Sequence, residues 1–266
     1  MDRYALFFDL DGTLMENVDH LYPKIEKMLD QLKKNGHLCF VATGRGYSNI
    51  PESLKSIMNG FITLTGAGCI MDGKDIIRHT VAKEYVDQFA KLSFSSGAPI
   101  YLENDERMDV IASDDFEYEK EVVEMRGFLT ETYKTYEEYK KTGIQTAKID
   151  TRIRFKEQID VLPAVRSGRL ITLDAGDGWY EILLSGVDKG TAIRELCGKI
   201  GHDIKNTICF GDSGNDLAMF EVCGISIAVS NASDEVKQKA TVVLEGDNQE
   251  AVIGILREYG LISSLD

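Results

Sequence analysis

Two aspartates that follow a short apolar run are the first candidates for chemistry. Residues 4–8 read YALFF, and Asp9, Asp11, Gly12 and Thr13 come directly after them. Side chains two positions apart on a strand point the same way, so both carboxylates can converge on one point. A turn is the structural alternative, and an EF-hand loop is excluded because the glycine falls too early. Acids that end an apolar strand are costly unless they hold a cation or perform acid–base work, which favours a functional site.

A second acidic group follows another apolar run far downstream. Residues 207–210 read TICF and lead into Gly211, Asp212, Asn215 and Asp216. A helix N-cap would explain Asp212, but it would not explain why two further polar residues follow. We therefore interpret this segment as a second part of the same kind of site.

Groups that could bind an anion occur at two other positions. Thr43, Gly44 and Arg45 follow the apolar run at 38–42 and supply a hydroxyl, a backbone amide and a guanidinium. A helix N-terminus after them would strengthen anion binding. Taken alone, this pattern is also that of an ordinary loop that begins a helix. Lys189 opens a predicted helix, where a lone lysine is usually a solvated surface residue.

The elements that must position these residues alternate between apolar strands and amphipathic helices. Buried strands separated by helices predict a doubly wound parallel sheet, that is, an α/β, Rossmann-like fold. We expect strands at 4–8, 38–42, 61–64, 207–210 and 225–229, and helices at 23–34, 189–200, 215–222 and 249–259.

The middle of the chain has a different pattern, in which several strands show alternation and the helices are strongly charged. This order predicts an α+β unit with an antiparallel sheet, inserted into the α/β domain. We expect helices at 83–93 and 115–126, and strands at 98–103, 108–112, 144–149, 169–174 and 179–184.

Composition and charge narrow the possible partners. The chain has 266 residues with 44 acidic and 30 basic side chains, which gives a net charge of −14. Nucleic acids and anionic membranes would repel such a chain, so we expect neither as a partner. If the protein binds an anion, local positive charge must offset the negative charge of the chain at the binding site. A divalent metal ion is the usual source of that charge.

The cysteines and the N-terminus favour a cytoplasmic protein. The five cysteines have no C-x-x-C spacing, and most lie in apolar runs, so we expect small buried side chains rather than disulfides or a zinc site. The first apolar run is too short for a signal peptide, and no stretch approaches the ~18 apolar residues of a membrane span. The four scattered histidines are expected at the surface.

In their order along the chain, these motifs resemble the haloacid dehalogenase-like superfamily, and within it the Cof-like sugar-phosphate phosphatases, which carry a large cap. The resemblance covers essentially the whole chain. It implies a catalytic core at 1–81 and 186–266 with an inserted cap, the substrate-specificity domain, at 82–185. One departure is Thr65, where this branch usually has asparagine before Gly-Ala. The motifs are Asp9-x-Asp11-Gly12-Thr13-Leu14, Thr43-Gly44-Arg45, Lys189 and Gly211-Asp212-x-x-Asn215-Asp216.

The resemblance implies catalytic and metal-binding roles for four aspartates. Asp9 would attack phosphorus to form an aspartyl-phosphate, and Asp11 would protonate the leaving alcohol and later accept a proton from water. Mg²⁺ would bind Asp9, Asp212 and the backbone carbonyl of Asp11. Asp216 would support this metal site from behind.

The resemblance also implies which residues bind the phosphate. Thr43, the Gly44 amide and Lys189 would hold the phosphoryl oxygens. Asn215 would orient Asp9, the phosphoryl group or a metal ligand. Arg45 would lie just beyond the phosphoryl site, as a candidate contact for the substrate.

These features together predict a Mg²⁺-dependent phosphatase of small phosphate monoesters, with sugar phosphates as the expected class. The expected partner is a small phosphorylated metabolite. A phosphomutase of the same superfamily is the nearest alternative, because it returns the phosphoryl group to a sugar. A non-catalytic sensor of phosphate ligands is a second alternative, and the presence of both Asp9 and Asp11 argues against it.

Overall fold

A computed structural model of the chain describes all residues except 1–2, 18–19, 113–128, 153–155, 177 and 266. Its internal contacts divide the chain into two compact units. The larger unit comprises Met1–Arg45, Ile50–Ile77 and Asp188–Asp266, and the smaller unit comprises Gly46–Asn49 and Arg78–Val187. The smaller unit differs from the expected insertion at 82–185 in two ways. Its main segment runs from Arg78 to Val187, and it also includes Gly46–Asn49.

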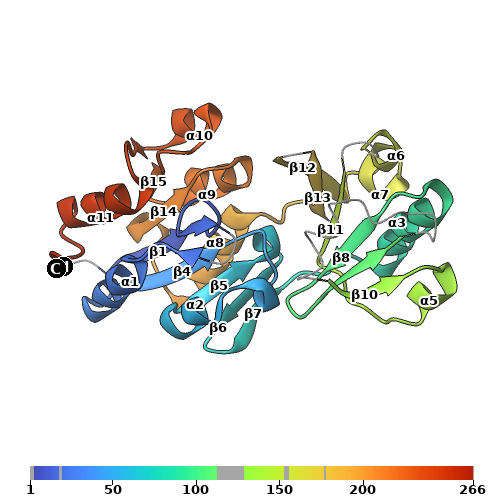
Figure 1. Cartoon of the computed structure of the whole chain (residues 1–266), viewed down its shortest axis with the longest axis horizontal. Helices are drawn as coiled ribbons and strands as arrows, with labels where there is room; N and C mark the ends of the chain where they lie inside the picture. Colours follow the sequence, from blue (N-terminus) through green and yellow to red (C-terminus); the bar gives the residue numbers. More distant parts are fainter. Residues whose placement is uncertain (1–2, 18–19, 113–128, 153–155, 177, 266) are drawn as a thin grey trace. The chain divides into compact units, whose positions relative to one another are not determined.

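The larger unit is built on one sheet of eight strands (Figure 1). Its order is β16-β15-β14-β1-β4-β5-β6-β7, and the strands from β16 to β5 are parallel, as the alternation of apolar runs and helices predicts. β6 runs antiparallel to β5. The bounds are β1 (Ala5–Phe8), β4 (Leu38–Ala42), β5 (Gly60–Thr63), β6 (Gly68–Met71), β7 (Lys74–Arg78), β14 (Thr207–Gly211), β15 (Ile225–Ala228) and β16 (Val242–Val243).

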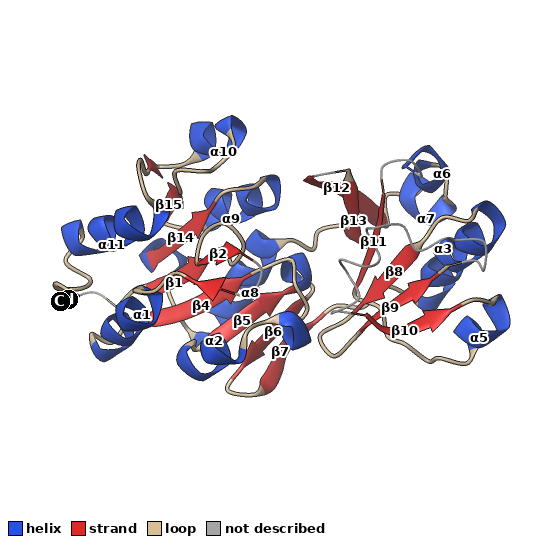
Figure 2. Cartoon of the chain, viewed as in Figure 1, coloured by secondary structure: helices blue, strands red, loops and turns tan. Residues whose placement is uncertain are grey.

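Helices flank this sheet (Figure 2). Along one face, Phe7 stacks on Phe40 and packs in a buried cluster with residues of α8 and α9. Phe8 points to the opposite face, where it stacks on Phe210. The helices are α1 (Ile25–Lys34), α2 (Glu52–Ile57), α8 (Lys189–Ile200), α9 (Leu217–Val222), α10 (Asp234–Lys239) and α11 (Asn248–Glu258), and β2 (Met15–Asn17) pairs with β3 (His20–Leu21).

The smaller unit contains a six-stranded sheet in the order β10-β9-β8-β11-β13-β12. One face carries an apolar core that includes Ile100, Leu102, Ile149 and Ile182. The strands are β8 (Ile100–Glu103), β9 (Met108–Ile111), β10 (Leu129–Tyr133), β11 (Lys148–Arg152), β12 (Leu170–Gly176) and β13 (Trp179–Leu184), and the helices are α3 (Lys83–Ser96), α5 (Tyr136–Lys140), α6 (Lys156–Asp160) and α7 (Pro163–Arg166).

The sheet is antiparallel, as predicted, except at one edge. β10 runs parallel to β9, whereas the other neighbouring strands of this sheet are antiparallel. A parallel neighbour needs a crossover of a dozen or more residues, and the long connection after Ile111 supplies that length. The helix expected at 115–126 falls in this connection and lies outside the described residues.

Buried polar and sulfur-containing side chains complete the larger core. Cys39, Cys69, Cys197 and Cys209 are buried, as expected. The expectation that the histidines lie at the surface is wrong for His37, because its Nδ1 accepts a hydrogen bond from the Tyr4 amide and its ring is buried.

Among the described residues, no helix is long and apolar enough to cross a membrane.

Candidate active site

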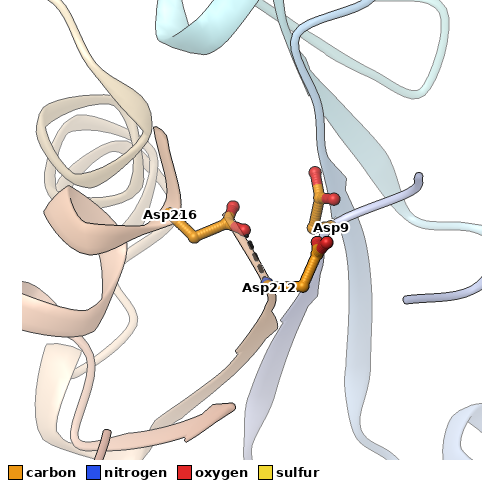
Figure 3. A group of neighbouring side chains, drawn as sticks. All are labelled: Asp9, Asp212 and Asp216. Carbon is orange, nitrogen blue, oxygen red and sulfur yellow. Dashed lines mark hydrogen bonds between the residues drawn. The ribbon is translucent and has the colours of Figure 1, made fainter. Parts of the chain in front are cut away.

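The acidic motifs meet because β1 and β14 are neighbours that end level with each other. Phe8 pairs with Phe210, and the Asp9 amide donates to the Phe210 carbonyl at 2.9 Å. Asp9 and Asp212 therefore leave the sheet side by side, while Asp216 follows in the short 3₁₀ turn Gly214–Asp216. Figure 3 shows the three carboxyl groups gathered at these strand ends. One oxygen of each lies within 4.8 Å of the others.

Lys189 neutralises part of this acidic group. Its Nζ lies 2.7 Å from Asp9 Oδ1 and 2.6 Å from Asp216 Oδ1, and the lysine is fully buried. Burial opposes its charge, but Asp216 and Asp9 outweigh that effect and hold the pKa of Lys189 above its usual value. The lysine is thus a member of the acidic cluster and not a solvated side chain.

The pKa values of two acids respond to this crowding. Burial, together with the charges of Asp216 and Asp212, raises the pKa of Asp9 well above its usual range, and Lys189 offsets only part of the rise. Burial and Asp216 likewise raise the pKa of Asp212 to about 6. One ammonium is insufficient for three carboxylates, so the site favours additional positive charge.

The hydrogen bonds distinguish the three acids. Asp216 is saturated by protein donors, because Oδ1 meets Lys189 and Oδ2 accepts from the amides of Asp212 and Ser213 at 2.9 and 3.0 Å. Asp212 Oδ1 is buried and has no hydrogen-bond partner among the residues that the structure describes. A hard divalent cation prefers such carboxylate oxygens. The donor set therefore fits Mg²⁺, with Asp9 and Asp212 offering oxygens and Asp216 fixing the loop behind them.

The loop after β1 allows close approach to Asp212. Gly12 has a φ of +77°, and a Cβ there would lie 2.8 Å from Asp212 Oδ2. Asn248 Nδ2 donates to the Gly12 carbonyl at 2.9 Å, and its Oδ1 accepts from the Ser230 amide at 3.0 Å. Asn248 is a supporting residue that sequence reasoning missed, because no local motif marks an asparagine so distant along the chain.

The candidate phosphate-binding loop follows β4. Thr43 is fully buried, its amide donates to the Ile62 carbonyl at 2.9 Å, and its Oγ1 accepts from the Arg45 amide at 3.2 Å. Gly44 lies between them on the same loop. The structure thus places the three residues one strand away from Asp9, on the neighbour of β1.

A strained turn joins this loop to Lys189. The short 3₁₀ segment Leu64–Gly66 begins with two non-glycine residues of positive φ, Leu64 and Thr65. The Thr65 amide donates to the Thr43 carbonyl at 3.0 Å. A Cβ on Gly66 would lie 2.2 Å from the Asp188 carbonyl oxygen, directly before Lys189. Thr65, the departure from the family pattern, is therefore buried inside a turn that contacts both candidate phosphate-binding elements.

Two remaining site candidates have clear partners. The Arg45 guanidinium forms an ion pair with Asp11, whose carboxylate is half-exposed. Asn215 lies in the turn before α9, and its Oδ1 accepts from Ser213 Oγ at 3.1 Å. The structure therefore brings all nine sequence-predicted site residues to the ends of β1, β4 and β14 and the start of α8.

The chain is similar to known proteins over nearly its whole length. A family model described as haloacid dehalogenase-like hydrolase matches residues 6–256. The 5-amino-6-(5-phospho-D-ribitylamino)uracil phosphatase of Escherichia coli (strain K12) is 22% identical, over 93% of this chain and 93% of that protein.

Solved structures share the fold. The structure of a sugar phosphatase of haloacid dehalogenase subclass IIB has a TM-score of 0.81 at 23% identity, covering 97% of this chain and 100% of that one. A phosphatase of the haloalkanoate superfamily from Bacteroides thetaiotaomicron has a TM-score of 0.83 at 20% identity, covering 98% and 96%.

Proposed function

The chain belongs to the haloacid dehalogenase-like hydrolase family, and from this premise we propose that it is a Mg²⁺-dependent phosphatase of small phosphate monoesters. The observation that carries the proposal is the buried pair of Asp9 and Lys189 with the half-buried Asp212 next to it, and with Asp11 at the end of the same strand as Asp9. Sugar phosphates are the proposed class, because one relative acts on a phosphorylated ribityl compound and one structural neighbour is a sugar phosphatase.

The first step transfers the phosphoryl group to Asp9. An Asp9 carboxylate oxygen attacks phosphorus and forms an O–P bond while the ester P–O bond breaks. The Asp11 carboxyl gives its proton to the departing oxygen, which leaves as an alcohol. Lys189 holds Asp9 Oδ1 at 2.7 Å and so fixes the carboxylate from the buried side.

The second step hydrolyses the aspartyl-phosphate. A water oxygen attacks phosphorus, its proton passes to the Asp11 carboxylate, and the bond between phosphorus and Asp9 breaks. Inorganic phosphate is released, and Asp9 and Asp11 return to their starting states. The same residue therefore serves first as acid and then as base.

The phosphoryl oxygens are held by the Thr43 hydroxyl, the Gly44 amide and the Lys189 ammonium. Asp9, Asp212 and the Asp11 carbonyl would hold Mg²⁺, which would supply positive charge that favours ionised Asp9 and screens its repulsion from the phosphate. Asp216 orients this group through Lys189 and the Asp212 amide. Asn215 orients Asp9, the phosphoryl group or a metal ligand.

The smaller unit, with the insertion at 82–185, is the proposed cap that selects the leaving group. The resemblance to phosphatases that carry a large inserted cap supports this assignment. The core then performs the chemistry, and the cap performs the selection.

Phosphate release from nitrophenyl phosphate and a panel of hexose and pentose phosphates tests the proposal. We expect Mg²⁺-dependent release that excess chelator abolishes, and a fall of more than ~10²-fold in kcat for Asp9→Asn, because an amide is not a competent nucleophile. Full activity in chelator or in Asp9→Asn would contradict the mechanism. Recovery of an isomerised ester in place of free phosphate would indicate a phosphomutase.

A further inference from the structure

Arg45 and Asp11 form a bidentate ion pair. Arg45 Nε donates to Asp11 Oδ2 at 3.0 Å, and Arg45 Nη2 donates to Asp11 Oδ1. Two parallel hydrogen bonds between a planar guanidinium and a planar carboxylate fix both the position and the plane of the carboxylate. A single ammonium in the same place would attract the charge without setting that plane.

Arg45 is the fixed partner in this pair. Its side chain is only 14% exposed, whereas that of Asp11 is 54% exposed. Its backbone is held on both sides, because its amide donates to Thr43 Oγ1 at 3.2 Å and its carbonyl accepts from the Leu64 amide at 3.0 Å. Leu64 has a φ of +52°, a conformation that a leucine keeps only when its surroundings enforce it.

Asp11 is the partner that needs to be held. It lies past the end of β1 and directly before Gly12, whose positive φ marks a sharp turn. A half-exposed carboxylate on a turn has several rotamers available. A general acid must lie within hydrogen-bond distance of the oxygen it protonates, and a misplacement of about 1 Å can cost ~10²-fold in rate.

We propose that Arg45 is a positioning residue that aims the Asp11 carboxyl at the leaving oxygen, and not a binding group for the phosphate. This inference rests on the proposed function, in which the Asp11 proton moves to the ester oxygen as the P–O bond breaks. Arg45 exchanges no proton in this step. The phosphoryl oxygens already have Thr43, Gly44 and Lys189 as donors.

Substrates with different leaving groups separate the two roles. Nitrophenolate leaves without a proton, whereas a sugar alkoxide needs one, so the transfer of the phosphoryl group to Asp9 depends on a well-aimed Asp11 only for the sugar phosphate. The later hydrolysis step is common to both substrates, so the comparison uses kcat/KM, which reports the transfer step. For Arg45→Gln we expect kcat/KM to fall ~10²-fold on a hexose phosphate and less than ~10-fold on nitrophenyl phosphate. Inhibition by inorganic phosphate is expected to stay unchanged, because phosphate needs no acid.

Arg45→Lys and a double-mutant cycle sharpen the test. Lysine keeps the charge but cannot form the two parallel hydrogen bonds, so we expect Arg45→Lys to behave like Arg45→Gln. In an Asp11→Asn background, Arg45→Gln is expected to cause no further loss on the hexose phosphate, because the residue through which it acts is gone. Circular dichroism confirms that each variant is folded before kinetics are compared.

A second pair of the same chemistry provides a matched control. Arg107 Nε and Nη2 donate to Asp109 Oδ1 and Oδ2 at 2.9 and 2.7 Å within the smaller unit. Arg107→Lys removes an equivalent pair of parallel hydrogen bonds. We expect the ratio of activity on the hexose phosphate to activity on nitrophenyl phosphate to stay at the wild-type value.

Three results would overturn the inference. Equal losses on both substrates together with weaker inhibition by phosphate would make Arg45 a phosphate-binding residue. Full activity in Arg45→Lys would show that charge alone is needed, and additive losses in the Asp11→Asn background would separate Arg45 from Asp11. A wild-type protein that releases no phosphate from any ester would instead contradict the proposed function, and the inference with it.

Discussion

A single buried lysine holds the acidic site together at the scale of the residue. Lys189 has no exposed surface and contacts both Asp9 and Asp216, which are themselves buried. Removing one partner from a buried ion pair leaves uncompensated charge in a medium of low polarity. The lysine is therefore expected to contribute to folding as well as to the proposed binding of phosphate.

Lys189→Met tests this structural contribution. Methionine fills a similar volume without charge, so we expect a loss on the order of 3–5 kcal/mol in the free energy of unfolding. Urea denaturation measures it. Lys199→Met on the same helix is the control, because that side chain is 47% exposed and its loss is expected to stay within ~0.5 kcal/mol. Equal stability of the two variants would exclude a structural role for Lys189.

The sequence predicts some site residues better than others. Asp9, Asp11 and Asp212 stand out because acids directly after apolar strands are energetically unusual. Lys189 carries no such signal by itself, since a lysine at a helix start is normally solvated, and only the ordered set of motifs marks it. Asn248 has no signal at all, because its role depends on the loops that tertiary folding brings to it.

At the scale of the element, the close packing of α8 against α9 fixes where Lys189 lies. Gly190 is the second residue of α8, and a Cβ there would lie 2.1 Å from the Ala218 carbonyl oxygen. No side chain fits this gap, so the two helices approach each other through backbone. Any widening of the gap displaces the lysine that binds Asp9.

Gly190→Ala is expected to reduce kcat by ~10²-fold, because a shift of about 1 Å in Lys189 misplaces the nucleophile. The matched control is Gly198→Ala on the same helix, where no atom lies within 4 Å of the added Cβ. Alanine there is expected to raise stability by up to ~1 kcal/mol with activity unchanged. Steady-state kinetics and thermal melts distinguish the two, and a fully active Gly190→Ala would show that α8 tolerates the shift.

Element predictions succeed where a strand is apolar or nearly so, and they fail where charged residues alternate along a buried strand. The strand at 38–42 is apolar throughout and has the expected bounds, and so does the strand at 179–184, in which Glu181 is the one charged residue. The strand expected at 144–149 is instead Lys148–Arg152, since Lys148 and Asp150 on this strand are charged and yet buried. From the sequence alone such residues are expected at the surface, because the residues that neutralise their charge lie on other strands.

At the scale of the whole molecule, the two units have separate cores, and the smaller one contains its own buried charge cluster. Lys148 Nζ lies 3.0 Å from Glu103 Oε2, 3.1 Å from Glu181 Oε1 and 3.3 Å from Asp150 Oδ2. These four residues come from β8, β11 and β13, and all are buried. One ammonium faces three carboxylates, so the cluster favours an additional proton.

The stability of the smaller unit is therefore expected to depend on pH through Asp150. Burial raises the pKa of Asp150 to about 8, against an ordinary value of ~3.9, and Lys148 offsets only part of this rise. Between these two pKa values the folded state binds more protons than the unfolded state, so stability falls as pH rises from about 4 to about 8. Asp150→Asn mimics the protonated acid and removes the titration. We expect its melting temperature to exceed that of the wild type at pH 8 and the difference to shrink toward pH 5.

Thermal melts at pH 5, 6.5 and 8 test this expectation, with Glu157→Gln as the control because Glu157 is an exposed acid of the same unit. The control is expected to follow the wild-type curve at every pH, since removing an exposed charge leaves the buried cluster intact. If Asp150→Asn kept the wild-type dependence on pH, the proton would reside on another carboxylate of the cluster. Glu103, whose pKa burial also raises, is then the residue to replace.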